Sequence, residues 1–471
     1  MATISSPGIG SGIDVQAIVS QLVALEKAPL TQLKAQATTF QAKLSAWGTI
    51  KAQVSALGDA ASKLADRGGW DAVKGSSSNP AAIGVTASAG ATPTSFSMEV
   101  QQLARSQATA TSAIAAGTPI GTGSLSIEIG SWSDGSFNPG GGTPVSVVIE
   151  EGKDSLANIA AAINKAGAGV TATVLKDASG ERLLMQSTAT GEVNGFRISV
   201  ADTDGDDTDA TGLSRLAFDG VSPNGNTLTQ TGQNALATIN GVPISTASNK
   251  LADTLPGMTL QLSQVISQPV TIDVTTDTDA IRTNLKAFVD AYNTLNTTLS
   301  NGLRYDAATK KASNLQGDST ATGLQNALRG MMRSVTASAP YARLNDVGIS
   351  LQTGGALKFD SDRFEAALGN LAGLEQLFTA NTGDTATEGF GKKIKAFAKG
   401  LVDTEGLVSN RTAALQRQID RNGTDQEKVE ERASRAQVRY LSMYNSMDAN
   451  VARLNGLNTF VSQQIALWNK G

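Results

Sequence analysis

The two ends of the chain share a hydrophobic pattern that its middle lacks: apolar residues recur at alternating intervals of three and four positions. The N-terminal stripe comprises Leu30, Leu33, Ala37, Phe40, Leu44, Trp47, Val54, Leu57, Ala61 and Leu64. The C-terminal stripe comprises Tyr440, Tyr444, Met447, Val451, Leu454, Val461, Ile465 and Trp468. This spacing is typical of a coiled coil, whose helices bury their stripe only against another helix. The pattern therefore predicts a shaft made of both terminal segments.

Two helices are predicted before the middle of the chain begins. Asp14 is placed to cap a short helix that continues to Leu25, because a carboxylate accepts the free amide hydrogens of a first helical turn. Pro29 ends that helix and suits the first turn of the next one, which carries the N-terminal stripe to about Asp66.

The middle of the chain has the period of strands. Phe96, Met98 and Val100 alternate with polar residues, as a half-buried strand requires. From about residue 107 to 270 we expect short strands and turns with one helix among them. Asp154 or Ser155 would cap that helix and Gly167 would end it.

The helical period returns after Thr278 with an amphipathic helix, followed by a second helix that Asp318 is placed to cap. A hairpin is predicted between Gly348 and Phe359, and Asp360 is expected to cap a further helix. From Phe390 onward the pattern is helical, with a polar interruption near Asn422 and Gly423.

These elements predict an α+β multidomain protein: terminal helices forming a coiled-coil shaft, a helical-bundle domain with a β-hairpin, and an inserted β-rich head. The predicted terminal or leg domain comprises residues 1–72 and 400–471. The helical bundle with short strands comprises 73–106 and 270–399. The head comprises 107–269 and is expected to hold two subdomains.

Composition limits the chemistry open to this chain of 471 residues. It has no Cys and no His, which excludes disulfides, thiolate nucleophiles, Cys/His zinc sites and imidazole acid–base catalysis. The net charge of −4 and the pI of about 5.2 give no basic face for nucleic acid or an anionic membrane. No apolar run approaches the roughly 18 to 20 residues of a membrane span.

Three motifs have a functional and a structural interpretation. Gly8, Gly10 and Gly12 are spaced as in a phosphate-binding loop, but no strand precedes them, so a tail that is flexible or ordered by assembly is favoured. The acidic run from Asp202 to Asp209 could bind calcium, yet it lacks the spacing and final Glu of an EF-hand, which favours a solvated loop. Carboxylate pairs for glycoside cleavage are not excluded by number, but nothing places two of them in one apolar cleft. We therefore expect no enzymatic activity and no cofactor or metal.

The sequence resembles the family of bacterial flagellar filament cap proteins, the hook-associated protein 2 (FliD) family, over its full length. The resemblance depends on blocks that occur in the order expected of the family. They are Gly8 to Asp14, Glu26 to Leu30, Phe96 to Ala104, Asp154 to Asn164, Ile239 to Gly241, Gly257 to Leu262, Phe288 to Asn293, and Val347 to Asp360. The last block is the most specific. The family often carries Phe where this chain has Tyr444.

The resemblance implies a ring of five or six copies at the distal tip of the flagellum, which retains exported flagellin and guides its polymerisation. It also implies contacts with hook–filament junction proteins and a cytoplasmic export chaperone, and export by the flagellar type III route. The absence of a basic segment followed by an apolar stretch agrees with export without a cleaved signal peptide. We further expect the termini to be poorly ordered alone and to fold on assembly.

The candidate assembly residues come from the two stripes, which we expect to pair within the chain and also to meet other subunits. They are Leu33, Phe40, Leu44, Trp47, Val54, Leu57, Tyr444, Met447, Val451, Leu454, Phe460, Ile465 and Trp468. Of these, Trp47, Phe460 and Trp468 are expected to be exposed. Two other functions stay open: another axial protein, such as flagellin or a hook–filament junction protein, and a surface adhesin whose head binds host mucin or glycans.

Overall fold

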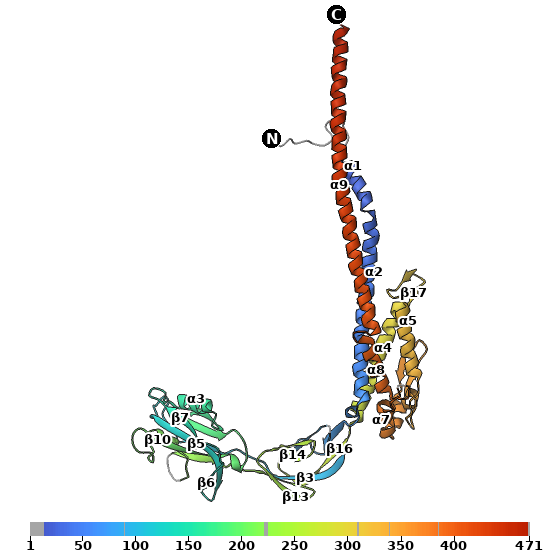
Figure 1. Cartoon of the computed structure of the whole chain (residues 1–471). Helices are drawn as coiled ribbons and strands as arrows, with labels where there is room; N and C mark the ends of the chain where they lie inside the picture. Colours follow the sequence, from blue (N-terminus) through green and yellow to red (C-terminus); the bar gives the residue numbers. More distant parts are fainter. Residues whose placement is uncertain are drawn as a thin grey trace. The chain divides into compact units, whose positions relative to one another are not determined.

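A computed structural model describes residues 14–88, 90–220, 225–308, 310–338, 340–384 and 386–469. The chain divides into two compact units, one of residues 1–70 with 279–471 and one of residues 71–278. The first is helical with two small hairpins, and the second is β-rich with one α-helix (Figure 1). The predicted fold class is confirmed: terminal helices, a helical bundle with a β-hairpin, and an inserted β-rich region.

The first unit contains eight α-helices within its described residues. They are α1 (Val15–Glu26), α2 (Ala28–Ala65), α4 (Thr278–Leu303), α5 (Ser319–Arg333), α6 (Ser361–Leu368), α7 (Leu371–Thr379), α8 (Phe390–Val402) and α9 (Leu407–Trp468). Two antiparallel hairpins accompany them: β17 (Tyr305–Asp306) with β18 (Lys311–Ala312), and β19 (Ile349–Leu351) with β20 (Leu357–Phe359).

The predicted helix caps are confirmed. The side-chain oxygen of Asp14 accepts the amide of Ala17 at 2.9 Å, and that of Asp360 accepts the amide of Arg363 at 3.1 Å. Gly348 precedes the second hairpin with φ +84, and a Cβ there would lie 2.6 Å from the carbonyl oxygen of Asp360. A side chain would therefore be strained and obstructed, which explains the glycine in the Val347–Asp360 block.

The C-terminal helical region is divided at a different place from the predicted interruption. The break lies at 403–406, between α8 and α9, whereas α9 runs without interruption through Asn422 and Gly423. Asn422 is tolerated there because its amide group has partners. It donates to Oε1 of Gln36 at 3.5 Å and accepts from Nε2 of Gln426 at 2.6 Å.

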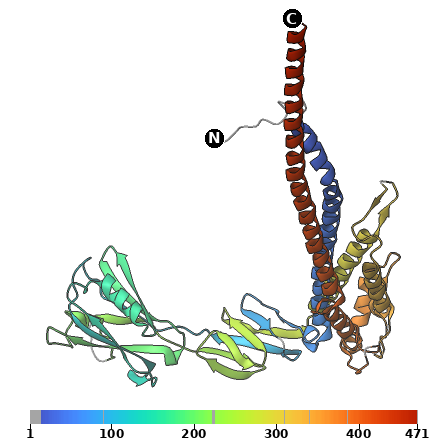
Figure 2. The same ribbon diagram turned by 45° about the horizontal axis from the view of Figure 1, so that its top comes forward.

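The second unit is built from antiparallel strands. Its strands are β1 (Val73–Ser77), β2 (Ile83–Ala87), β3 (Thr94–Gln102), β4 (Ala108–Thr111), β5 (Gly123–Ser133), β6 (Ser136–Pro139), β7 (Val145–Ile149), β8 (Val170–Asp177), β9 (Gly180–Ser187), β10 (Gly195–Asp202), β11 (Asn226–Gln230), β12 (Ala235–Ile239), β13 (Val242–Thr246), β14 (Lys250–Leu255), β15 (Met258–Leu262) and β16 (Ile266–Thr276). Helix α3 (Leu156–Ala166) begins at Ser155, whose hydroxyl caps it, and ends at Gly167. One core gathers β1–β3 and β12–β16, and another gathers α3 with the strands between them (Figure 2).

Strand pairing changes the assignment of residues 73–106. Strand β3 pairs with β16 and β12, and β1 pairs with β16, in one five-stranded sheet ordered β1-β16-β3-β12-β13. This segment, predicted to accompany the helical bundle, thus lies in the β-rich unit. The alternation of Phe96, Met98 and Val100 predicted the strand, but not its partners, because hydrogen-bonded neighbours can come from any distance along the chain. The remaining domain boundaries stay a prediction.

Candidate assembly surface

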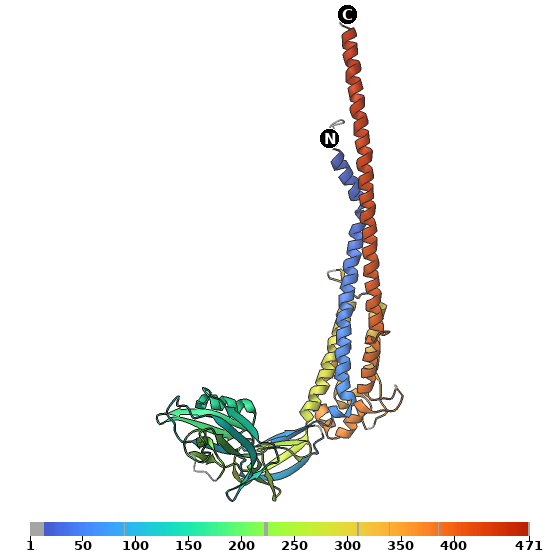
Figure 3. The same ribbon diagram turned by 60° about the vertical axis from the view of Figure 1, so that its left-hand side comes forward.

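The terminal helices of the first unit pack side by side and run in opposite directions, as Figure 3 shows for α1 and α2 beside α9. Near the middle of the pair, Asn422 contacts Gln36. Further along, Arg432 Nε lies 3.3 Å from Glu26 Oε2, and the Tyr440 hydroxyl donates to Glu26 Oε1 at 3.4 Å. Residue numbers therefore rise along α9 as they fall along α2 and α1. The predicted pairing of the two ends within one chain is confirmed.

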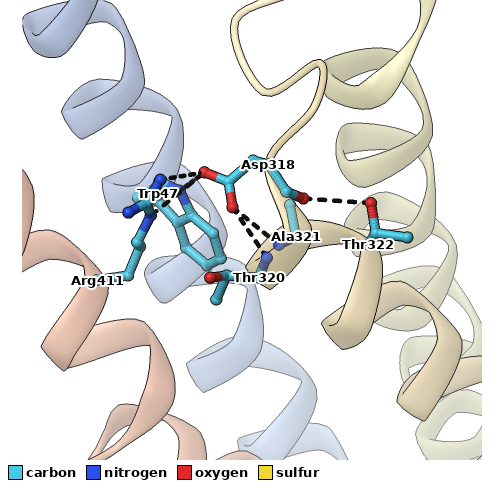
Figure 4. A network of polar contacts seen from close by, with 6 residues as sticks. All are labelled: Trp47, Asp318, Thr320, Ala321, Thr322 and Arg411. Atoms are coloured by element: carbon cyan, nitrogen blue, oxygen red, sulfur yellow. Dashed lines mark hydrogen bonds and ion pairs between the residues drawn. The ribbon is translucent and has the colours of Figure 1, made fainter.

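A buried carboxylate joins α9 to the rest of the helical unit. Oδ2 of Asp318 accepts from Arg411 Nη2 at 2.7 Å and from the indole N–H of Trp47 at 3.4 Å, while Oδ1 accepts the amides of Thr320 and Ala321 (Figure 4). Asp318 therefore caps α5, as predicted, and also binds α2 and α9. Burial opposes ionisation of this carboxyl, but the hydrogen bond and charge of Arg411, with the hydrogen bonds from the Ala321 amide and the Trp47 indole, outweigh it and hold its pKa below the ordinary value.

The N-terminal candidate residues are largely internal. Trp47 is completely buried, and Val54 and Leu57 are buried beside it in the core formed with α4, α5 and α8. Leu33, Phe40 and Leu44 are half-buried, and Leu44 packs against that core. The expectation that Trp47 is exposed was wrong. The pattern predicted one partner helix, whereas the bundle surrounds this part of α2 on further sides and the indole N–H bonds Asp318.

The C-terminal candidates show the opposite trend along α9. Tyr444 and Val451 are half-buried, and Met447 is 36% exposed. The candidates beyond them are all more exposed: 64% at Leu454, 58% at Phe460, 52% at Ile465 and 87% at Trp468. Figure 1 shows why: α9 continues beyond the first residues of α1, so no described helix of the unit covers this end.

Three exposed apolar residues of the same segment were not among the candidates. Leu457 is 52% exposed, Val461 is 45% exposed and Leu467 is 65% exposed. Val461 belongs to the predicted stripe, but Leu457 and Leu467 lie beside it. Leu457, Phe460 and Leu467 follow one another at intervals of three and seven residues, which is also a helical spacing. A search for a single stripe does not detect this second one. We call residues 454–468 the C-terminal apolar segment.

The C-terminal apolar segment carries no charged side chain. Seven of its side chains are large, apolar and at least 45% exposed: Leu454, Leu457, Phe460, Val461, Ile465, Leu467 and Trp468. Burying such a side chain fully contributes roughly 1.5 to 3 kcal/mol. A contiguous apolar surface of this kind marks an interaction site rather than a solvated helix.

The acidic loop does not form an evident ion site. Carboxylates of this loop accept hydrogen bonds from nearby backbone amides. Asp202 accepts one from Ser214 at 2.9 Å, and Asp206 accepts one from Thr208 at 2.9 Å. Among the residues that the structure describes, no group of three or more acidic side chains is placed to hold a metal ion. The glycine motif at Gly8, Gly10 and Gly12 lies outside the described residues.

The β-rich unit has a small apolar pocket of about 280 Å³. Trp132, Phe218 and Leu228 line it, together with several glycines and Glu192. Its volume lies just below the usual range for small-molecule sites, and the indole N–H of Trp132 is engaged by the carbonyl of Phe196 at 3.1 Å. Glycan binding by the head stays a prediction, to be tested on a glycan array with this unit.

In the described part of the chain, no helix is both long and apolar enough to cross a membrane.

Family models match most of the chain. The model described as flagellar hook-associated protein 2 N-terminus matches residues 11–107, and the C-terminus model of the same protein matches 232–456. Between them, the flagellin hook IN motif matches 136–189.

Curated proteins agree with these models over almost the whole length. Flagellar hook-associated protein 2 of Escherichia coli K12 is 31% identical over 477 residues, covering 98% of each chain. The B-type flagellar hook-associated protein 2 of Pseudomonas aeruginosa is 29% identical and covers 95% of this chain and 94% of its own. Among solved structures, the D1-D2-D3 domains of the flagellar cap protein FliD from Escherichia coli match with a TM-score of 0.62 at 29% identity. That match covers 79% of this chain and 99% of the other. The chain belongs to the flagellar hook-associated protein 2 family.

Proposed function

We propose that this protein caps the distal tip of the bacterial flagellum, where it retains exported flagellin and promotes its ordered polymerisation. The observation that carries the proposal is the C-terminal apolar segment, present in a chain of the hook-associated protein 2 family. A helix that extends an apolar, uncharged end beyond its own bundle is suited to insertion into a helical assembly. The proposed role is structural and involves no catalysis.

Four further points belong to the same proposal. The protein works as a ring of identical copies, with flagellin and hook–filament junction proteins as its partners at the filament end. A cytoplasmic chaperone covers its apolar helix before export, which follows the flagellar type III route without a cleaved signal peptide. The contacts that hold the cap are apolar and replaceable, which suits a cap that must move as each flagellin subunit is added.

The test is the culture supernatant of a strain that lacks this gene. We expect abundant unpolymerised flagellin outside the cells and short or absent filaments, because export continues while capping is lost. Restoring the gene should return flagellin to the filament. Normal filaments with little free flagellin in the deletion strain would overturn the cap function and favour the adhesin.

A further inference from the structure

The apolar cavity of the β-rich unit has two aromatic walls. Trp132 and Phe218 line it, and their rings meet edge to face, with centroids 5.3 Å apart and an angle of 66° between their planes. Both side chains are only half-buried, so part of each ring faces the cavity. The indole N–H of Trp132 already donates to the carbonyl oxygen of Phe196. The walls therefore offer ring surface to an occupant rather than hydrogen bonds.

Glycines keep the space beside the indole free. Gly220 has φ +80, and a Cβ there would lie 2.5 Å from Cζ3 of Trp132. A Cβ at Gly195 would lie 2.7 Å from Oε1 of Gln107 and 3.3 Å from Cδ1 of Trp132. Any larger residue at either position would displace the lining of the cavity. The shape of the cavity thus depends on the absence of side chains at these two positions.

The charge of the lining favours a cation. Glu192 is the only ionisable side chain that lines the cavity among the residues that the structure describes, and it is exposed. The guanidinium of Arg197 is directed elsewhere, because it lies over the ring of Phe137 at 4.8 Å and forms an ion pair with Glu128. The face of an aromatic ring attracts a cation, and a nearby carboxylate adds to that attraction. An ammonium or guanidinium group on an apolar stem therefore matches this lining, whereas an anion does not.

Size and position indicate that the cation arrives on a polypeptide. The cavity has a volume of about 280 Å³, just below the usual range for whole small molecules, so it suits a single side chain. Leu228, which is 47% exposed, lines it from strand β11, and Thr231 and Gly232 line it directly after that strand. In the described strand order β11-β4-β9-β8, β11 is an edge strand. Such an edge accepts an extended polypeptide through backbone hydrogen bonds.

We propose that this cavity binds an arginine or lysine side chain of a partner polypeptide that pairs with β11. The rings of Trp132 and Phe218 contact the cation and its stem, and Glu192 supplies the opposite charge. The proposal concerns the β-rich unit and does not rest on the cap function, so its failure would leave that function standing.

Saturation-transfer difference nuclear magnetic resonance on the full chain tests the charge of the occupant. The probe is a capped pentapeptide with arginine between two threonines on each side. The comparison peptide carries citrulline, which has the shape of arginine without its charge. We expect saturation of the arginine methylene protons and an affinity at least about threefold weaker for the citrulline peptide. Equal affinities for the two peptides would overturn the proposal.

Substitutions test whether binding occurs in this cavity. E192Q removes the carboxylate and keeps its shape, and should weaken binding of the arginine peptide at least about threefold. E151Q is the matched control, because Glu151 is exposed in the same unit and does not line the cavity. W132A should abolish the signal. Since Trp132 also packs against Phe137, a W132A chain that fails to fold leaves E192Q to decide. Native affinity in E192Q would overturn the site.

The pairing with β11 has its own test. Capped arginine carries the cation without a strand, so we expect it to bind more weakly than the pentapeptide. N-methylation of the threonine amides blocks backbone hydrogen bonds and should remove the advantage of the pentapeptide. Equal affinity of the three probes would overturn the pairing. Binding of choline without binding of either arginine probe would overturn the polypeptide partner and assign the cavity to a free organic cation.

Discussion

Helix α9 is one continuous helix, but its start is buried within the helical unit and its end is exposed. Near its start, Leu415 is 1% exposed, and Arg411 binds the buried carboxylate of Asp318. Near its end, Leu454 is 64% exposed and Trp468 is 87% exposed. Both ends have large apolar residues at helical spacing, yet within the described residues only those of the first end are buried in the core of the helical unit. This difference shows that helical periodicity predicts an apolar face that will be buried, but does not identify which molecule or segment buries it.

The two parts of α9 therefore have different roles, one in the fold of the chain and the other in contacts with other molecules. The first turns of α9, with Val408 and Leu415, and the second half of α2 belong to the core that holds the helical unit together. The last part of α9 contributes nothing to that core and so is available to other molecules. The expectation that the termini are poorly ordered alone stays a prediction for residues 454–468, whereas the buried core leads us to expect order at residues 50–64 of the isolated chain. The buried positions Trp47, Val54 and Leu57 make the C-terminal apolar segment the better candidate for folding on assembly.

The largest expected effect is on the free energy of unfolding, when Leu is replaced by Ala once at a buried position and once at an exposed position of the apolar stripes. L57A removes a side chain that is 1% exposed, and should lower the free energy of unfolding of the helical unit by about 3 kcal/mol. L454A removes one that is 64% exposed and should change it by less than about 0.5 kcal/mol. Urea unfolding of the full chain, followed by far-ultraviolet circular dichroism, measures both. Equal losses would mean that the apolar segment is part of the folded core.

The next effect concerns the contact that fixes the start of α9. D318N removes the charge that Arg411 and Trp47 share, and should lower the free energy of unfolding by about 2 kcal/mol. D425N is the matched control, because Asp425 pairs with Lys428 on the exposed face of the same helix at 3.1 Å. The control should change stability by less than about 0.5 kcal/mol. A D318N loss no larger than that of D425N would show that the buried contact does not secure α9.

A smaller effect should appear in acid. Burial would raise the pKa of Asp318, but Arg411 and the Ala321 amide outweigh it, so the pKa is lower in the folded chain than its ordinary value of 3.8. The stability it contributes is therefore complete above the unfolded pKa and is lost as the pH falls through the lower folded pKa. Below pH 3.8 the stability of the native chain should fall more steeply than that of D318N. Parallel slopes for the two chains would contradict this assignment.

The smallest effect is kinetic and leaves stability unchanged. Amide hydrogen exchange of the isolated chain should be slow at residues 50–64 of α2 and fast at residues 454–468, since exposed helix ends open locally. Adding a partner or raising the chain concentration should slow exchange in the second segment alone. Strong protection of residues 454–468 in the monomer would show that the segment already has a partner within its own chain.

Much of the fold could be predicted from local chemistry. Asp14, Asp318 and Asp360 were recognised as caps because a short carboxylate side chain before an apolar period satisfies amides that a helix leaves free. Pro29 and Gly167 marked helix boundaries for equally local reasons. The partners of these elements could not be found in the same way. Residues 73–106 pair with strands more than a hundred positions away, and one sequence carries no direct record of that pairing.

The candidate assembly residues could likewise be predicted only in part. The spacing of Leu454, Ile465 and Trp468 predicted an apolar face, and the structure leaves that face exposed. The same spacing at Trp47, Val54 and Leu57 led to residues that the bundle buries. The second stripe through Leu457 and Leu467 became visible only when the exposed fractions along one continuous helix could be compared.

By itself, the sequence determined most of the helices and strands, their caps, the exclusion of thiol and imidazole chemistry, and the family resemblance. These depend on residues near one another in the chain or on residue types that are absent altogether. Tertiary structure alone decided which half of each apolar stripe is core and which is surface, where residues 73–106 belong, and that Asp318 joins three helices. The physical reason is that burial depends on every neighbour in space, whereas periodicity records only the direction in which a side chain points.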